Sequence, residues 1–156
     1  MSELIEGAQA PDFDVAGALG PITLADFKGK PLVVYFYPKD DTPGCTKESQ
    51  AFSALKADFE KAGASLLGVS KDSLARHAKF TAKYDLTVPL GSDPDGVMIE
   101  RYGSWVEKTL YGRQYMGIDR STFLIDADGK LARIWRKVRV PGHAEAVLDA
   151  VKSLKA

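Results

Sequence analysis

The chain contains 156 residues, of which 45% are hydrophobic and 27% charged, a composition typical of soluble globular proteins. Its 21 basic and 21 acidic side chains balance to a formal net charge of zero, so no overall charge favours nucleic acid or an anionic membrane as a partner. The single cysteine, Cys45, excludes an internal disulfide and a cysteine-rich metal site. The length predicts one domain over residues 1–156, with a core that needs neither disulfide nor metal.

No targeting or membrane segment is predicted. The first 13 residues contain acidic side chains, no basic start and no apolar run of signal-peptide length. The longest uncharged stretch, Val15 to Ala25, is interrupted by glycine and proline, and it is far shorter than the roughly 20 apolar residues of a membrane span. Together with the unpaired cysteine, this indicates a cytoplasmic protein, because thiols stay reduced there. The sequence also has no Walker or dinucleotide-binding motif, so no cofactor is predicted.

Strands and helices alternate through the middle of the chain, which predicts an α/β fold. The first half is expected to contain a hairpin over residues 13–24, a strand buried on both faces at 32–37, a helix from Cys45 to about Lys61, and a strand at 65–69. The second half is expected to contain a helix capped by Asp72 or Ser73 and ending at Tyr84, a short strand at 89–92, a short helix at 97–102, paired strands at 118–125 and 131–135, and a final amphipathic helix through Val147 and Leu154.

This order predicts a central mixed sheet flanked by helices, with an N-terminal hairpin. Thioredoxin-like folds have this layout, but periodicity alone does not distinguish them from flavodoxin-like folds.

Cys45 falls at the predicted start of a helix, just after a buried strand. Unpaired backbone N–H groups and the positive end of the helix dipole favour an anion at that position, and a thiolate is the reactive form of cysteine. A lower pKa alone increases the reactivity of a cysteine only a few-fold, because a less basic thiolate is also less nucleophilic. A cysteine enzyme therefore needs further groups that position its substrate and stabilise the leaving group.

Two blocks of sequence resemble the peroxiredoxins. Pro38, Thr42 and Cys45 match the Pro-x-x-x-Thr/Ser-x-x-Cys motif of that family. The run Thr-Pro-Gly-Cys-Thr-Lys-Glu at 42–48, together with residues 104–108 and 111–126, is similar to the subfamily called bacterioferritin comigratory protein or peroxiredoxin Q. The resemblance extends from about Gly7 to the last helix, and it favours the thioredoxin-like fold.

The resemblance implies an antioxidant thiol peroxidase that reduces hydrogen peroxide and organic hydroperoxides without a metal or cofactor. By match to the family motif, Cys45 is the peroxidatic cysteine, and Arg120 lies beside its thiolate from a later strand. Thr42 is expected to bond the thiolate and one peroxide oxygen, while Pro38 shields the pocket from water. Backbone N–H groups near Gly44 are expected to act as further donors.

Four further residues receive supporting roles or alternative interpretations. Glu48 is expected to anchor the arginine or the helix geometry rather than to transfer a proton. Trp105 and Tyr111, together with Tyr115, either shape a hydroperoxide pocket or pack on a surface loop.

Two competing functions need different surroundings for the cysteine. A cysteine hydrolase needs His77 or His143 as a base beside Cys45; we expect His77 to be packed in the core and His143 to be exposed beside a helix cap. A non-catalytic thioredoxin-like binding module leaves the joint presence of Pro38, Thr42, Cys45 and Arg120 unexplained.

The chain departs from many of its relatives in having no resolving cysteine. Those relatives carry one five residues after the peroxidatic cysteine, where this chain has Gln50. Its sulfenic acid must therefore be reduced by an external thiol (thioredoxin, glutaredoxin or glutathione) or by Cys45 of a second subunit. The balanced charge is compatible with a monomer or a weak homodimer.

Because the chain has no resolving cysteine, Cys45 should be sensitive to overoxidation. We expect graded peroxide, in the absence of thiols, to convert Cys45 to sulfinic and then sulfonic acid, which intact-mass spectrometry detects as added oxygen. Added glutathione should suppress these products. A protein that stops at the sulfenic acid under excess peroxide would contradict this expectation.

Overall fold

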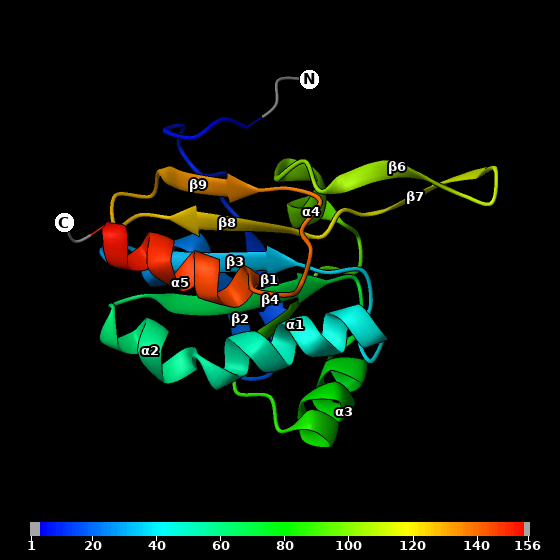
Figure 1. The fold of residues 1–156 in the computed structure, drawn as a ribbon, viewed down its shortest axis with the longest axis horizontal. Helices are drawn as coiled ribbons and strands as arrows, with labels where there is room; N and C mark the ends of the chain where they lie inside the picture. The colour runs from blue at the N-terminus through cyan, green and yellow to red at the C-terminus, as the bar shows by residue number, and fades with distance from the viewer. Residues whose placement is uncertain (1–3, 155–156) are drawn as a thin grey trace.

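The computed structural model describes residues 4–154, in which seven strands form one mixed sheet and two further strands form a separate hairpin. The sheet has the order β2-β1-β5-β4-β3-β8-β9 and is flanked by helices (Figure 1). Its strands are β1 (Asp14–Gly17), β2 (Gly20–Thr23), β3 (Leu32–Phe36), β4 (Ser65–Ser70), β5 (Leu90–Ser92), β8 (Ser121–Ile125) and β9 (Leu131–Trp135). The predicted α/β architecture with an N-terminal hairpin is confirmed.

The central strand β3 lies between parallel β4 and antiparallel β8. All five of its residues have no exposed surface, and the buried run continues through Tyr37. A strand that is apolar on both faces must be covered on both sides, and two separate clusters of core side chains do so. This burial holds the carboxyl end of β3 in place at the point where the chain turns toward Cys45.

Each face of the sheet is covered by different helices. One core cluster contains side chains of α1 (Pro43–Ala54), α2 (Lys56–Lys61) and α5 (His143–Ser153), and α3 (Leu74–Tyr84) joins it through Phe80. The other contains Met98 and Ile99 of α4 (Val97–Arg101), with Phe27 of the short 3-10 helix η1 (Leu24–Phe27) packed against it. In Figure 1 the helices α1, α2 and α5 lie together on one side of the sheet.

The helix predicted from Cys45 to Lys61 is wrong as a single element. The chain forms α1 and α2, which are separated at Leu55 (φ −98°, ψ 4°). Phe52 and Phe59 are both fully buried, with ring centroids 5.9 Å apart. Their apolar spacing is the same whether or not the helix is interrupted, so the sequence pattern contains no signal of the break.

The single strand predicted over residues 118–125 is also wrong. Ile118 ends β7 (Arg113–Ile118), which pairs with β6 (Trp105–Leu110), and β8 begins only at Ser121. The β6–β7 hairpin was not predicted, because most of its side chains are exposed and show no clear alternation. Its turn uses positive φ at Tyr111 and Gly112 (51° and 77°), a conformation for which Asn-Gly is the usual sequence signal.

Across residues 4–154, no helix combines the length and apolarity needed to cross a bilayer.

Candidate active site

Cys45 occupies the first turn of α1 and is 1% exposed. Thr42 is the N-cap and Pro43 the first helical residue, where a missing N–H is tolerated. The Thr46 N–H donates to the Thr42 carbonyl at 2.8 Å, so the Gly44 and Cys45 N–H groups precede the helical hydrogen-bond ladder. The sulfur therefore lies at the positive end of α1, as the sequence predicts.

Arg120 brings a fixed positive charge to the sulfur. Its Nη2 donates to Cys45 Sγ at 3.5 Å, and its Nη1 donates to Glu48 Oε1 at 2.7 Å. Arg120 lies in the two-residue break between β7 and β8, not within a strand as the resemblance implied. The break frees its backbone from strand pairing, while the paired strands on either side hold its position.

Glu48 is the buried anchor of this arginine. The side chain is 1% exposed, and Oε2 has no hydrogen-bond partner among the described residues. Burial raises the pKa of Glu48 to about 7, and the nearby Arg120 charge opposes this rise. Arg120 therefore hydrogen-bonds the Glu48 carboxylate and the Cys45 sulfur, which lie 72 and 75 residues away along the chain.

Gly44 allows the arginine to approach. A Cβ at this position would lie 3.0 Å from Arg120 Nη2, closer than ordinary van der Waals contact, and 3.6 Å from Cζ, at ordinary contact distance. The absence of a side chain thus lets the guanidinium reach Cys45 across the first turn of α1.

Thr42 and Pro38 lie in the loop between β3 and α1, which leads to Cys45. The Thr42 hydroxyl donates its proton to the Lys39 carbonyl at 2.8 Å. This differs from the prediction that the hydroxyl bonds the thiolate. Its oxygen retains lone pairs that can accept a hydrogen bond from a hydroperoxide O–H. Pro38 is partly buried in the same loop.

Tyr111 cannot shape a hydroperoxide pocket as one interpretation suggested. It is 95% exposed at the hairpin turn, and Tyr115 on β7 is also exposed. Trp105 packs against the second core cluster with Lys71 Nζ 4.4 Å above its ring, which corresponds to the packing alternative. The hairpin contributes Lys108 instead, whose pKa is lowered mainly by burial and is also influenced by Asp119, Arg120 and Cys45.

Neither histidine is placed to act as a base for Cys45. His77 is buried and bonded to Asp40 and to the Gly91 carbonyl. The expectation that His143 is exposed is wrong, because it is 7% exposed and hydrogen-bonded to Thr122 at 2.7 Å. Burial, followed by the Arg120 charge, lowers the pKa of His143 to about 4. In the part of the chain that the structure describes, Arg120 is the side chain that hydrogen-bonds the sulfur, which disfavours a hydrolase.

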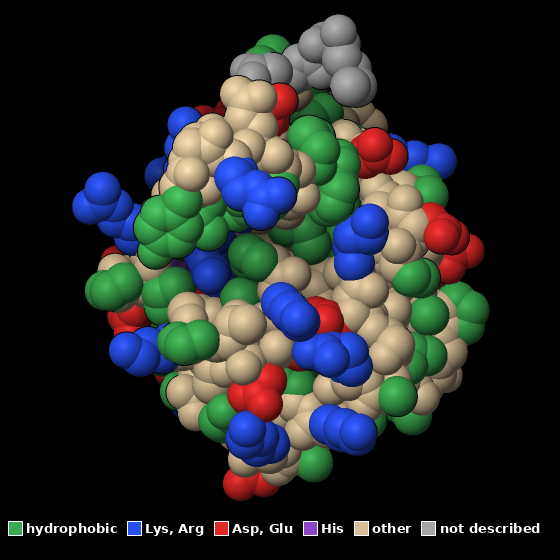
Figure 2. Space-filling view, turned by 90° about the vertical axis from the view of Figure 1, so that its right-hand side faces the viewer, with side chains coloured by type: hydrophobic (Ala, Val, Ile, Leu, Met, Phe, Trp, Pro, Cys, Tyr) green, Lys and Arg blue, Asp and Glu red, His purple; other side chains and the backbone are tan. Residues whose placement is uncertain are grey.

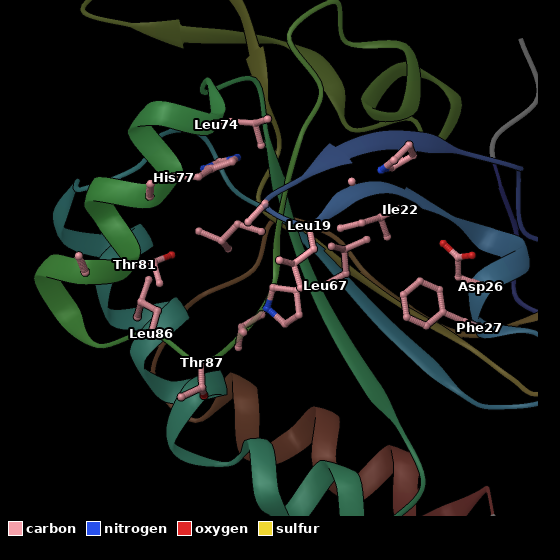
Figure 3. Close-up of a pocket in the computed structure, with 18 residues that line it drawn as sticks. Leu19, Ile22, Asp26, Phe27, Leu67, Leu74, His77, Thr81, Leu86 and Thr87 are labelled. Carbon is pink, nitrogen blue, oxygen red and sulfur yellow. The ribbon is translucent and has the colours of Figure 1, made fainter.

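A separate cavity lies away from Cys45. A groove of about 720 Å³ runs between the β1–β2 hairpin and α3, and apolar side chains such as Leu19, Ile22 and Leu74 line most of it (Figure 3). None of the predicted site residues lines this groove. Residues 4–154 also contain no cluster of three or more His, Cys, Asp or Glu side chains suited to hold a metal ion.

The buried arginine–cysteine–glutamate arrangement at a helix start is accompanied by clear similarity to known proteins. Residues 7–134 match the model of the AhpC/TSA family. The chain therefore belongs to this family.

Individual relatives narrow the assignment further. The chain is 46% identical to "Peroxiredoxin Bcp" of Xanthomonas campestris, covering 98% of both chains, and 43% identical to "Peroxiredoxin Bcp" of Bacillus subtilis, covering 95% of both. A Xylella fastidiosa PrxQ mutant structure superposes with a TM-score of 0.93 at 38% identity, covering 100% of both chains. An X. campestris bacterioferritin comigratory protein structure gives 0.88 at 46% identity, covering 92% of both. These matches place the chain among the Bcp/PrxQ peroxiredoxins, and its single cysteine is consistent with the 1-Cys type.

Gly44→Ala should slow the reaction of Cys45 with peroxide without unfolding the protein. The new Cβ pushes the Arg120 guanidinium away from the first turn of α1, whereas alanine restricts the unfolded chain more than glycine does and has no unfavourable helix propensity. We expect the second-order rate of Cys45 oxidation, followed by intrinsic fluorescence, to fall about 10-fold or more while the melting temperature stays near the parent value. An unchanged rate would show that the close approach of Arg120 is dispensable.

Glu48→Gln should change the pH dependence of stability. Because the pKa of Glu48 is about 7 in the folded protein, above its ordinary 4.5, the unfolded chain loses this proton first as the pH rises. Its contribution therefore stabilises the fold at low pH and is lost between about pH 4.5 and 7. Urea unfolding of parent and variant across this window should show the free energy of unfolding falling more steeply in the parent. If the free energy of unfolding depends on pH equally in the parent and the variant, the raised pKa of Glu48 is contradicted.

Proposed function

We propose that this peroxiredoxin reduces hydrogen peroxide and organic hydroperoxides through a sulfenic acid on Cys45. The single observation that carries this proposal is the contact of the buried Cys45 sulfur with an arginine that Glu48 holds in place. An arginine keeps its charge at any physiological pH, so it can favour the thiolate throughout the reaction. The X. campestris relative is described by its alkyl peroxide reduction activity, which supports organic hydroperoxides as substrates.

In the chemical step, the thiolate attacks one oxygen of the O–O bond and displaces the other. A sulfur–oxygen bond forms, the O–O bond breaks, and the electron pair leaves with an alkoxide or hydroxide that takes a proton from water. Negative charge thus moves from Cys45 to the departing oxygen. Arg120 and the N–H groups of Gly44 and Cys45 are donors that can follow this charge, and the Thr42 oxygen can accept from the peroxide O–H.

Reduction of the sulfenic acid requires a thiol from outside the chain. One thiol condenses with it to a mixed disulfide and water, and a second thiol releases Cys45. Two solved structures of X. campestris peroxiredoxin Q carry serine in place of cysteine at different positions, so that relative has at least two cysteines where this chain has one. Thioredoxin, glutaredoxin, glutathione and Cys45 of a weakly associated second copy are the candidate reductants.

The molecular surface around the start of α1 carries positive charge that can attract an anionic thiol. Figure 2 looks onto the side where the β6–β7 hairpin ends and α1 begins, and several Lys and Arg side chains lie across this face. Lys39 and Lys47, which flank the site in sequence, are both exposed. Positive charge here would increase the encounter rate with an anionic thiol such as glutathione, most strongly at low salt. We place this antioxidant activity in the cytoplasm, carried by one domain that spans the chain.

Substitution of the reacting groups tests the proposal. Cys45→Ser should abolish thiol-dependent peroxide consumption, and Arg120→Ala should reduce its rate by about 10²–10³-fold, as for other lost transition-state donors. Arg120→Lys should recover only part of this loss, because lysine lacks the planar two-pronged donor geometry. The exposed Arg133→Ala, on the edge strand β9, serves as a matched control that should keep full activity. Peroxide consumption by Cys45→Ser would refute the proposal.

A further inference from the structure

The loop that leads to Cys45 rests on a buried polar cluster contributed by three elements. Asp40, 2% exposed, accepts the Tyr37 hydroxyl at Oδ1 and contacts His77 Nδ1 at Oδ2, both at 2.6 Å. The other ring nitrogen of His77, Nε2, lies 3.0 Å from the Gly91 carbonyl of β5. The cluster thus connects the end of β3, the middle of α3 and the sheet through Asp40 and His77.

The two partners of His77 determine where its protons are. A carbonyl oxygen can only accept, so Nε2 must carry a hydrogen toward Gly91. The Tyr37 hydroxyl donates to Asp40, so the hydrogen between Asp40 and Nδ1 must come from that pair. His77 and Asp40 together therefore hold two hydrogens, one on Nε2 and one in the contact between Asp40 Oδ2 and Nδ1.

Among residues 4–154, no hydrogen bond links another acidic side chain to His77. Asp72, just before α3, accepts the Asp40 backbone N–H at 2.8 Å and is itself paired with Arg76. On its opposite side His77 borders the apolar groove, where Asp26 of η1 is the lining carboxylate (Figure 3). His77 is 4% exposed, so little water competes for its hydrogen bonds.

The same helix fixes the remainder of the loop. Asp41 has a positive φ of 59°, which costs energy for a residue with a side chain. Lys83 Nζ and the Tyr84 hydroxyl, at the end of α3, hold its carboxylate at 2.8 and 2.6 Å. The loop residues Lys39 to Thr42 therefore depend on α3, and Asp40 is the buried point of attachment.

We propose that His77 is a positioning residue of the Cys45 site: its imidazolium holds the Asp40 carboxylate and so fixes the loop that carries Pro38 and Thr42. The proposal rests on the peroxidase function proposed above. His77 does not touch the reacting atoms, and it acts only through the position of Asp40. Displacement of Asp40 moves Lys39 and Thr42 together, because Thr42 is bonded to the Lys39 carbonyl.

Nitrogen-15 NMR of the untagged protein reads the protonation directly. The chain has two histidines, and His143, with a pKa of about 4, supplies a neutral imidazole as an internal reference at pH 7. We expect both nitrogens of His77 to show the shifts of protonated nitrogen at that pH. In Asp40→Asn the new amide can donate to Nδ1 and still accept from Tyr37, so Nδ1 should change to an unprotonated nitrogen. An unprotonated ring nitrogen of His77 in the parent protein at pH 7 would overturn the proposal.

Kinetics of Cys45 oxidation by peroxide test the positioning role. His77→Gln can still donate to Gly91 but leaves Asp40 without its partner, and we expect the rate to fall by up to about 10²-fold through misplacement. His77→Asn, which can still donate to Asp40, and Asp40→Asn, which keeps the loop attached, should both react faster than His77→Gln. The exposed Lys79→Gln on the same helix controls for an unspecific effect.

Each outcome separates the two proposals. A parent protein that does not consume peroxide refutes the peroxidase function, whatever the NMR spectrum shows. An active parent whose folded His77→Gln variant reacts equally fast refutes only the positioning role. If His77→Gln fails to fold, the comparison rests on folded His77→Asn and Asp40→Asn, which replace the imidazolium–carboxylate pair by a neutral hydrogen bond: rates below the parent rate support the proposal, and rates equal to the parent rate overturn it.

Discussion

The rest of the site depends on one buried ion pair between Glu48 and Arg120. It joins the first helix to the short break between two strands, and it holds the guanidinium against Cys45. Burying a carboxylate beside an arginine is costly unless both are well bonded, and one oxygen of Glu48 has no partner among the described residues. The raised pKa of Glu48 reflects this cost. The protein thus retains a costly buried carboxylate at the place where it holds Arg120.

The Glu48–Arg120 pair can hold the guanidinium against Cys45 because the surrounding elements, which come from distant parts of the chain, fix the loop and the helix on which the site is built. β3, buried on both faces, fixes the start of the loop between β3 and α1. Helix α3 holds this loop through hydrogen bonds to Asp40 and Asp41. Gly44 leaves the space through which the guanidinium reaches the sulfur. A reaction that moves charge from sulfur to oxygen benefits from donors that need no rearrangement during the step, and this scaffold supplies that rigidity.

Local sequence predicted much of the fold. The hairpin at 13–24, β3, β4, α3 with its Ser73 cap, and β9 follow from apolar period, turn residues and capping. The prediction failed where local pattern has no information. The break at Leu55 leaves the apolar period unchanged, and the β6–β7 hairpin has few buried positions to create one. His143 was predicted to be exposed, although α5 packs it against Thr122.

For the site, the sequence by itself determined the missing second thiol and predicted the proposed reacting atom: Cys45 at a helix start, in a family motif, with no other cysteine in the chain. The tertiary structure alone decided which groups surround it. Arg120, which hydrogen-bonds the sulfur, lies 75 residues from Cys45 along the chain. The Thr42 hydroxyl donates to the Lys39 carbonyl. His77 contacts the loop through Asp40 and does not lie beside the thiol. Such contacts arise from strand pairing and helix packing between segments far apart in the chain, and no local periodicity encodes them.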